Sequence, residues 1–503
     1  MLLRLPGENL IRSDLKNSEN SAKNSGGTGD RVEMNARGGY ITGNYGGSLG
    51  QGQYIEVFGK RRARHRRRGA DSRLVTELGA AFGFYQGGGR IVVGRDTRST
   101  GAMFEDALVA GLLSAGCQVV KLGVVPTPTI QFTVTRTGAS GAVAITASHN
   151  PAQWNALKFI GSRGTFLDRG EASELFDLYS QGSLPCRGEK DFREVRFMEG
   201  AFKEHMARIF SVVDAELIRK RRFRVAVDCA NGVGALCSAG FLEKLGCEVF
   251  AINTEIDGFR RPPEPLPENL GELAELVKRE HCDVGFGQDP DGDRLTVVTD
   301  RGEALNPHYT VALAVEQVLE GGDPGPVVVN MQTSRLLEYI CGAFDCRLLS
   351  SKVGEINVVE KMIESDSEIG GEGNCGGVIY RRVHPGRDSF TGMALILERL
   401  AMGDGTLSEI IDGYPPMCNL SARFTVPPIP AREVLARLSR KYEKYHPLTF
   451  DGLRFDLEEG RILVRSSNTE PIMRLNVEAD DRPAAEALLN RFTEEIEQEL
   501  ASL

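Results

Sequence analysis

The sequence predicts an α/β protein with three repeated α/β domains and a smaller C-terminal α+β domain. Segments typical of buried strands alternate with segments typical of helices, and the same order recurs three times before about residue 415. Each copy places an unusual polar loop after its third strand, at Ser148, Asp289 and Glu372. After about residue 415 the alternation continues on a smaller scale. This order favours right-handed crossovers and mixed, mainly parallel sheets.

The first copy shows the pattern clearly. Its first helix places Phe104, Leu108 and Leu112 on one face and ends at Gly116, the usual position for a helix-terminating glycine. The elements expected around this helix are strands 91–94, 118–122 and 141–145 and a second helix 126–137.

The second and third copies repeat this order. In the second copy we expect strands 223–227, 248–252 and 283–287, a helix ending at Gly246 and a helix 270–279. In the third copy we expect strands 327–329, 347–350 and 368–370 and helices 334–341 and 355–363. Because the three polar loops follow equivalent strands, they can converge on one cleft between the domains.

The last part of the chain has a different plan. Its expected elements are strands 424–427, 461–464 and 473–478 and helices 431–442 and 482–500. The domain boundaries that follow are a disordered extension over residues 1–53 and domains over 54–195, 196–303, 304–414 and 415–503.

The composition indicates a globular protein of ordinary type. Of 503 residues, 41% are apolar and 26% are charged, enough for sizeable cores. The net charge of −9 argues against a nucleic-acid-binding protein, and no apolar run is long enough to predict a membrane-spanning helix. The ten cysteines include no C-x-x-C pair, so their spacing indicates neither a zinc site nor a disulfide framework. The N-terminus lacks the apolar segment of a signal peptide, and we expect a cytoplasmic protein.

Ser148 lies in the loop after the apolar strand 141–145, at the end of the sheet where α/β proteins bind ligands. A serine with an adjacent histidine, His149, and a nearby lysine, Lys158, can carry a covalent group and move a proton. Taken alone, the same residues are also compatible with a capping serine in an ordinary turn, a loop histidine and a solvated lysine.

Asp289, Asp291 and Asp293 alternate around Gly292, and a turn at this glycine can bring their oxygens around one cation. A small number of hard oxygen ligands suits Mg²⁺, which would offset charge on a transferred phosphoryl group. A calcium loop is an alternative, but its longer sequence pattern is missing. An aspartyl-phosphatase is another, although it would need no serine loop.

Four motifs occur in the order 146–151, 289–294, 371–374 and 465–471. Together they resemble the α-D-phosphohexomutase family, and the resemblance runs from about Leu74 to the C-terminus. It implies four domains around one central cleft. It also implies a catalytic phosphoserine at Ser148, acid/base roles for His149 and Lys158, and Mg²⁺ held by Ser148, Asp289, Asp291 and Asp293.

The implied reaction moves a phosphoryl group between the 6- and 1-positions of a hexose or hexosamine phosphate. The phosphoserine phosphorylates the sugar phosphate, the bisphosphorylated sugar turns around, and its other phosphoryl group returns to the serine. A bisphosphorylated sugar is therefore the expected activator. The expected partner is a small-molecule sugar phosphate, with no nucleic acid and no membrane, and the chain is expected to be a monomer or a homodimer.

The resemblance assigns substrate contacts to two loops and their neighbours. A carboxylate and an amide can bind paired sugar hydroxyls, and an arginine can bind phosphate through two donors. The expected contacts are Arg294, Gly354, Glu355, Glu372, Asn374, Arg465, Ser466, Ser467, Asn468, Thr469 and Arg474. Many relatives continue the glutamate loop with Ser-Gly-His, whereas this chain has Gly373-Asn374. This variant favours a phosphoglucosamine mutase; a phosphomannomutase/phosphoglucomutase, or an impaired relative that only binds sugar phosphates, is the alternative.

Residues 60–68 form a dense basic run, KRRARHRRR. In the family a small glycine-rich loop stands at this place, after a strand that Tyr54–Gly59 resembles, and the match resumes near Leu74. We interpret residues from about 60 to 73 as a local frameshift, because so many like charges repel one another beside a strand end. The alternative is a genuine insertion that binds a polyanion.

Overall fold

The computed structural model describes residues 71–466 and 471–503, apart from 183, 185, 192 and 323–324, together with the backbone of four short strands before residue 59. Residues 59–70, which contain the basic run, lie outside the described residues, and so do Ser467, Asn468 and Thr469. The predictions for these residues therefore also lie outside the described part of the chain. None of the helices in the described part is both long and apolar enough to cross a membrane.

The first α/β domain contains a seven-stranded sheet with the strand order β3-β4-β8-β7-β5-β6-β9. The predicted strands β5, β6 and β7 pair in parallel, and β8 returns antiparallel to β7. Its strands are β3 (Ser48–Gly50), β4 (Tyr54–Phe58), β5 (Arg90–Arg95), β6 (Gln118–Val124), β7 (Gly141–Ile145), β8 (Asn155–Gly161) and β9 (Val195–Phe197). Its helices are α1 (Ser72–Tyr85), α2 (Gly101–Ser114), α3 (Thr127–Thr137) and α4 (Arg169–Ser180).

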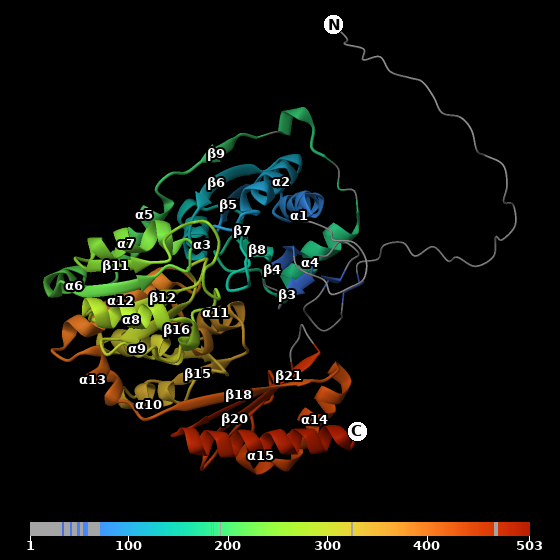
Figure 1. Ribbon diagram of the computed structural model, residues 1–503. Helices are drawn as coiled ribbons and strands as arrows, with labels where there is room; N and C mark the ends of the chain where they lie inside the picture. The colour runs from blue at the N-terminus through green and yellow to red at the C-terminus, as the bar shows by residue number, and fades with distance from the viewer. Residues whose placement is uncertain are drawn as a thin grey trace, which may run out of the picture. The chain divides into compact units, whose positions relative to one another are not determined.

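Alternation along β5 explains why helices cover both faces of this sheet. Ile91 and Val93 pack in one buried cluster with α1 and α2, whereas Val92 packs in another with Ile130 and Val134 of α3. Figure 1 shows these helices around the strands. Successive side chains of a strand point to opposite faces, so a continuous apolar run indicates a sheet buried on both sides.

The predicted extension over residues 1–53 differs from the structure at three places. Ser48–Gly50 forms β3, which pairs antiparallel with β4. It bonds to the N–H and C=O groups that β4 would otherwise leave unpaired at the edge of the sheet. Two further short strands, β1 (Glu33–Met34) and β2 (Ile41–Thr42), pair with each other. The strand expected at the start of the first domain is β4, which pairs with β8.

The second and third domains repeat one sheet, in the orders β11-β10-β12-β13 and β15-β14-β16-β17. In each sheet the first three strands are parallel, and the fourth returns antiparallel after the polar loop. The second domain comprises α5 (Ala201–Phe210), α6 (Ala215–Arg221), β10 (Arg224–Asp228), α7 (Gly234–Lys244), β11 (Glu248–Ile252), α8 (Gly271–Glu280), β12 (Val284–Gln288) and β13 (Leu295–Thr299). The third comprises α9 (His308–Glu320), β14 (Val327–Asn330), α10 (Leu336–Ala343), β15 (Leu348–Ser351), α11 (Glu355–Glu364), β16 (Ile369–Glu372), β17 (Gly377–Tyr380), α12 (Ser389–Met402) and α13 (Leu407–Asp412).

The second and third domains share one hydrophobic core. Phe241 of α7 and Phe390 of α12 are both fully buried, and their ring centroids lie 5.4 Å apart in an edge-to-face arrangement. Cluster members extend from Met206 to Tyr414, across the boundary between the two domains. This packing fixes the polar loop of one domain relative to that of the other.

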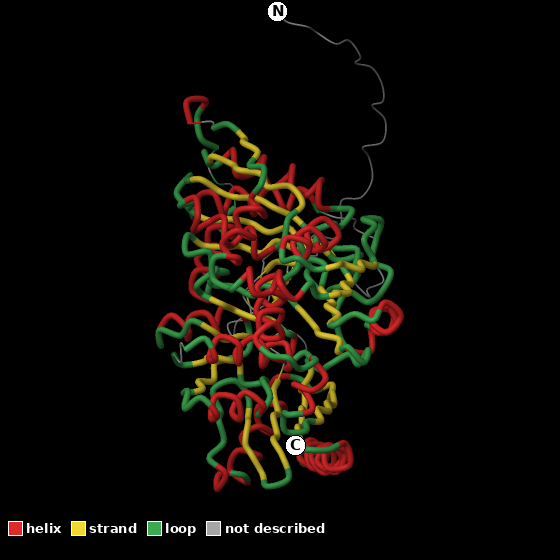
Figure 2. Tube along the Cα trace, turned by 90° about the vertical axis from the view of Figure 1, so that its left-hand side faces the viewer, coloured by secondary structure: helices red, strands yellow, loops and turns green. Residues whose placement is uncertain are grey.

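The C-terminal domain is an antiparallel sheet with the order β18-β21-β20-β19 and two helices. Figures 1 and 2 show α15 against one face of this sheet, and Figure 2 views the helix end-on. The elements are β18 (Cys418–Thr425), α14 (Pro428–Lys441), β19 (Leu453–Leu457), β20 (Gly460–Ser466), β21 (Ile472–Ala479) and α15 (Arg482–Ala501). The strand predicted at 424–427 is therefore misplaced: Pro427 and Pro428, which cannot donate a backbone hydrogen bond, end it early and begin α14.

Candidate active site

The Ser148 loop is held rigidly at the end of β7. Ser148 has a φ of 47°, a left-handed conformation that is uncommon outside glycine. Its N–H donates to Thr146 Oγ1 (2.9 Å), and the Thr146 hydroxyl donates to Asp96 Oδ2 (2.7 Å). The buried Arg98 guanidinium pairs with Asp96 and donates to the backbone oxygens of Ser148 and Asn150. A charged network therefore stabilises the strained backbone that presents the serine.

The Ser148 hydroxyl points to the second domain. It donates to Asp289 Oδ2 at 2.9 Å, although Asp289 lies 141 positions later in the chain. The other oxygen of Asp289 accepts the N–H groups of Asp293 and Arg294, both at 3.1 Å, and Gly292 makes the turn with a φ of +72°. The serine loop and the aspartate loop therefore meet, as their equivalent strand ends predicted.

The three aspartates form one buried group, in which one carboxylate oxygen from each residue lies within 4.8 Å of the other two. Burial and the neighbouring charges of Asp291 and Asp293 raise the pKa of Asp289 well above its usual value. Asp291 Oδ1 and Asp293 Oδ1 are buried without a hydrogen-bond partner. Buried carboxylate oxygens of this kind normally bind a cation or a donor, so the three side chains fit a hard divalent ion such as Mg²⁺.

Lys158 lies on β8 and extends between the aspartates. Its Nζ is 2.7 Å from Asp291 Oδ2 and 3.3 Å from Asp293 Oδ2. Burial alone lowers the pKa of this ammonium, but the two carboxylates outweigh it and hold the pKa above its usual range. The alternative of a solvated lysine is wrong, because the side chain is buried. In this arrangement the Lys158 ammonium stays charged, so it can donate a proton but cannot accept one.

His149 is half-buried beside the serine, and its Nδ1 has no hydrogen-bond partner. Burial and the nearby Arg294 guanidinium lower the pKa of His149 well below its ordinary value, so its imidazole is neutral. It does not accept the Ser148 hydroxyl in this structure, since Asp289 does. Arg294, expected to contact substrate, is largely buried and pairs with Glu264 at 2.6 Å.

Arg387, which the sequence analysis missed, joins the second and third domains. Its guanidinium donates to Asp293 Oδ2 (2.7 Å) and Glu372 Oε2 (2.8 Å), and its Nε lies 3.0 Å from Glu355 Oε2. Glu355 also accepts from Gln131 of α3 (2.9 Å), which brings in the first domain. Arg387 belongs to no recognised motif; the available signal was a charged residue in the loop directly before a long apolar helix.

The loop predicted to contact the sugar, residues 371–374, is called the sugar loop. In it Glu372 is buried, whereas Asn374 is exposed. Glu372 Oε1 accepts from the Gly354 N–H (2.7 Å) and the Asn330 amide (2.8 Å). The Asn330 amide also donates to Asn374 Oδ1 at 2.7 Å. Glu372 is thus fixed by neighbouring residues, and Asn374 is presented to solvent.

The predicted phosphate loop follows β20 in the C-terminal domain, and the structure describes Arg465 and Ser466 of it. Arg465 Nε lies 3.1 Å from Asp451 Oδ2, and that oxygen also accepts the Val353 N–H (2.9 Å) of the third domain. Arg474 on β21 stands directly opposite Arg465, and Arg423 on β18 directly opposite Arg474. Opposite residues share a sheet face, so three cationic side chains form a row suited to an anion.

Comparison with known proteins identifies the family. Sequence models of the phosphoglucomutase/phosphomannomutase family match in chain order: α/β/α domain I over residues 56–184, domain II over 201–302, domain III over 306–417 and the C-terminal domain over 428–495. A phosphoglucomutase/phosphomannomutase of Thermococcus kodakarensis is 35% identical, over 85% of this chain and 95% of its own. A phosphoglucosamine mutase of Methanococcus maripaludis is 30% identical, over 80% of this chain and 90% of its own.

The fold is also found in a solved structure. A crystal structure of a phosphoglucomutase/phosphomannomutase family protein from Burkholderia thailandensis superimposes with a TM-score of 0.75 and 26% identity. The match covers 90% of this chain and 96% of that one.

Proposed function

The chain belongs to the phosphoglucomutase/phosphomannomutase family, and we propose that it moves a phosphoryl group between the 6- and 1-positions of a hexosamine phosphate through Ser148. The observation that carries this proposal is the 2.9 Å hydrogen bond from the Ser148 hydroxyl to Asp289, inside a buried group of three aspartates. This contact between two domains supports a serine nucleophile that acts beside a cation-binding loop.

The serine carries the phosphoryl group in both directions. In the first half-reaction the bond from phosphorus to Ser148 Oγ breaks, and a new bond forms to a sugar hydroxyl, whose proton must leave. The neutral imidazole of His149 can accept that proton. The Lys158 ammonium, 2.7 Å from Asp291, can neutralise charge on the transferred group or return a proton to Ser148 Oγ.

Asp289, Asp291, Asp293 and the phosphorylated Ser148 would hold Mg²⁺. The cation supplies positive charge that stabilises the phosphoryl group during transfer. Arg387 binds Asp293 and Glu372 simultaneously, and it therefore keeps the cation loop at a fixed distance from the sugar loop.

The remaining side chains bind the substrate. Asn374 and Glu372 would bind the sugar hydroxyls, and Arg465 and Ser466, with residues 467–469 and Arg474, would bind the phosphate that is not reacting. Because the intermediate must turn around, this second site releases one phosphate and binds the other. Gly354 and Glu355, at the start of α11, and Arg294, which follows Asp293, would make further contacts with the substrate.

Glucosamine phosphate is the substrate that we propose. The Gly373-Asn374 variant of the sugar loop and the similarity to the Methanococcus maripaludis phosphoglucosamine mutase support it. The similarity to the Thermococcus kodakarensis enzyme supports phosphoglucomutase/phosphomannomutase activity as the second candidate. We further propose a cytoplasmic enzyme that acts on small molecules as a monomer or a homodimer.

A substrate panel tests the function. The 6-phosphates of glucosamine, glucose and mannose are supplied with and without a bisphosphorylated sugar, and 1-phosphate formation and free phosphate are both measured. We expect the highest kcat/KM with glucosamine phosphate, activation by the bisphosphate and little free phosphate. Equal kcat/KM for all three sugars would favour a broad mutase, and release of free phosphate without isomerisation would indicate a phosphatase.

A further inference from the structure

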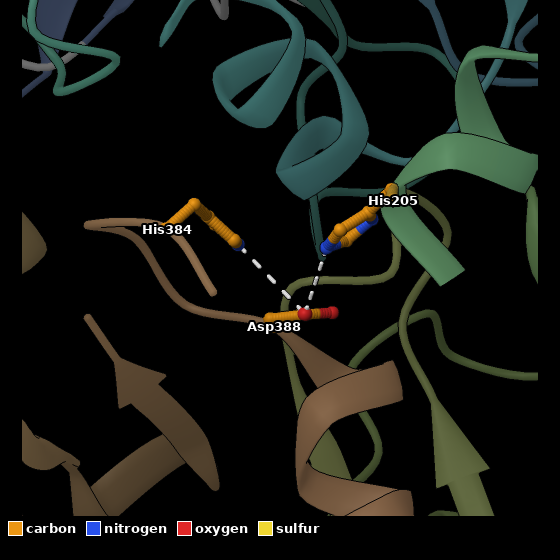
Figure 3. Close-up of side chains that lie close together, drawn as sticks. All are labelled: His205, His384 and Asp388. Carbon is orange, nitrogen blue, oxygen red and sulfur yellow. Dashed lines mark ion pairs between the residues drawn. The ribbon is translucent and has the colours of Figure 1, made fainter. Parts of the chain in front are cut away.

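A second group of titratable side chains lies outside the proposed active site. His205 is on α5, Asp388 precedes the first residue of α12, and His384 is in the loop before it. Figure 3 shows both imidazoles directed at the Asp388 carboxylate. His205 Nε2 lies 3.2 Å and His384 Nε2 lies 3.8 Å from the same oxygen, Asp388 Oδ2. One atom from each side chain lies within 4.8 Å of the other two.

The group is deeply buried where three domains meet. The exposed fractions of His205, His384 and Asp388 are 0%, 2% and 1%. His205 comes from the second domain and the other two residues from the third. Thr129 of the first domain is fully buried as well, and its Oγ1 lies 3.1 Å from His205 Nδ1.

Ordinary hydrogen bonding accounts for only part of this arrangement. Thr129 satisfies Nδ1 of His205, but both ring nitrogens of His384 are buried without a hydrogen-bond partner. His205 Nε2 makes no geometrically acceptable hydrogen bond either, in spite of its short distance to Asp388. Buried polar atoms are almost always satisfied, so the two unsatisfied Nε2 atoms that face one carboxylate point to a shared ligand.

We propose that His205 Nε2, His384 Nε2 and Asp388 Oδ2 bind one divalent transition-metal cation of the zinc type. Two imidazole nitrogens and one carboxylate oxygen are the ligands that Zn²⁺ accepts, whereas Mg²⁺ prefers oxygen ligands only. Thr129 Oγ1 can accept the Nδ1–H of His205, which leaves the Nε2 lone pair for the metal. A ligating histidine usually has such a partner for its second nitrogen.

The metal would hold the loop that carries Arg387. Asp388 follows Arg387 directly, and its other oxygen caps α12 by accepting the Phe390 N–H (3.0 Å). The Thr391 hydroxyl donates to Asp388 Oδ2, which orients the carboxylate towards the imidazoles. The cation would thereby link α5 to the start of α12 and fix the arginine that contacts Asp293 and Glu372. This site is structural, and its existence does not depend on the proposed reaction.

Metal binding to the untagged full chain tests the proposal. The protein is stripped with a chelator, dialysed, and titrated with Zn²⁺ or Co²⁺ in excess Mg²⁺, which saturates the aspartate site. We expect one bound equivalent per chain by equilibrium dialysis and metal analysis. The Co²⁺ form should show visible bands of a nitrogen- and oxygen-ligated ion, without the charge-transfer bands of a thiolate. His384→Asn should weaken Zn²⁺ binding at least about tenfold.

Two controls make the result specific. His446→Asn alters an exposed histidine of the C-terminal domain, and this variant should still bind one Zn²⁺ per chain. Asp291→Asn should do so as well, because that residue belongs to the other group. The proposal is overturned if no Zn²⁺ or Co²⁺ binds in excess Mg²⁺, if His384→Asn binds the ion as tightly as wild type, or if Asp291→Asn abolishes binding. If His384→Asn does not fold, pulsed electron paramagnetic resonance of a bound paramagnetic ion decides whether histidine nitrogens ligate it in the wild-type protein.

Discussion

The loops of the three α/β domains and the phosphate loop of the C-terminal domain are assembled in different ways. Ser148 and Lys158 of the first domain, Asp289 of the second and Arg387 of the third are buried in one polar network. Arg465 instead pairs with Asp451 of its own domain, and it begins a row of three arginines, one on each of three neighbouring strands. The first region is buried and held in place by ion pairs, which suits transfer chemistry. The second region offers positive charge to a phosphate that must bind and be released.

Packing reinforces this difference. The second and third domains share a hydrophobic core, so the cation loop and the sugar loop cannot move independently without breaking it. The C-terminal domain has a core of its own and is joined to the third domain by polar contacts, such as Ser334 to Glu478 at 2.9 Å. Changes in the first region should therefore affect kcat, and changes in the second should affect KM.

The largest effect is expected for Ser148→Ala. Loss of the covalent carrier should lower kcat at least about a hundredfold, because alanine has no side-chain oxygen that could carry the phosphoryl group. Steady-state kinetics measures this, with Ser466→Ala as the matched loss of a hydroxyl in the phosphate loop, where KM should rise instead. Mass spectrometry should find phosphate on Ser148 of the active enzyme; a consistently unphosphorylated Ser148 would contradict the mechanism.

Asp291→Asn should have the next largest effect. The substitution removes one negative charge from the cation site and also from the contact with Lys158. We expect the Mg²⁺ concentration for half-maximal activity to rise roughly tenfold or more. Mg²⁺ titrations of wild type and variant measure it, and superimposable curves would remove this residue from the site.

Arg465→Ala should act mainly on substrate binding. Loss of a charge-assisted contact to phosphate corresponds to about tenfold or more in KM, with a smaller change in kcat. Arg423→Ala, at the far, exposed end of the arginine row, should raise KM only a few-fold. If Arg465→Ala lowered kcat and left KM unchanged, the division between the two regions would be wrong.

The smallest effect concerns pH and Glu355. Burial raises the pKa of Glu355 to about 7, even though Arg387 opposes the shift. The folded protein therefore holds a proton that the unfolded chain releases near pH 4.5, so stability from this group falls as pH rises from about 4.5 to about 7. Comparing Tm over this range, we expect the decrease to be shallower in Glu355→Gln than in wild type. Parallel profiles would show that Glu355 does not titrate in this window.

The sequence alone determined the repeat and the positions of three key loops. Strands such as β7 and β10 are apolar runs that end at a polar loop, and this local pattern is visible without any tertiary contact. The returning strands β8, β13 and β17 were not predicted. In β8, for example, Asn155 and Lys158 interrupt the apolar pattern because both are buried against partners from elsewhere in the chain.

Only the tertiary structure could decide which charges meet. Arg387 lies 94 positions from Asp293, and Lys158 lies 133 positions from Asp291, so no local pattern relates them. The same holds for His205 and His384, which lie far apart in the sequence but face the same carboxylate, Asp388. The periodicity of apolar residues indicates which face of a helix or strand packs in the core of its own domain. A site between domains depends instead on how those cores pack together.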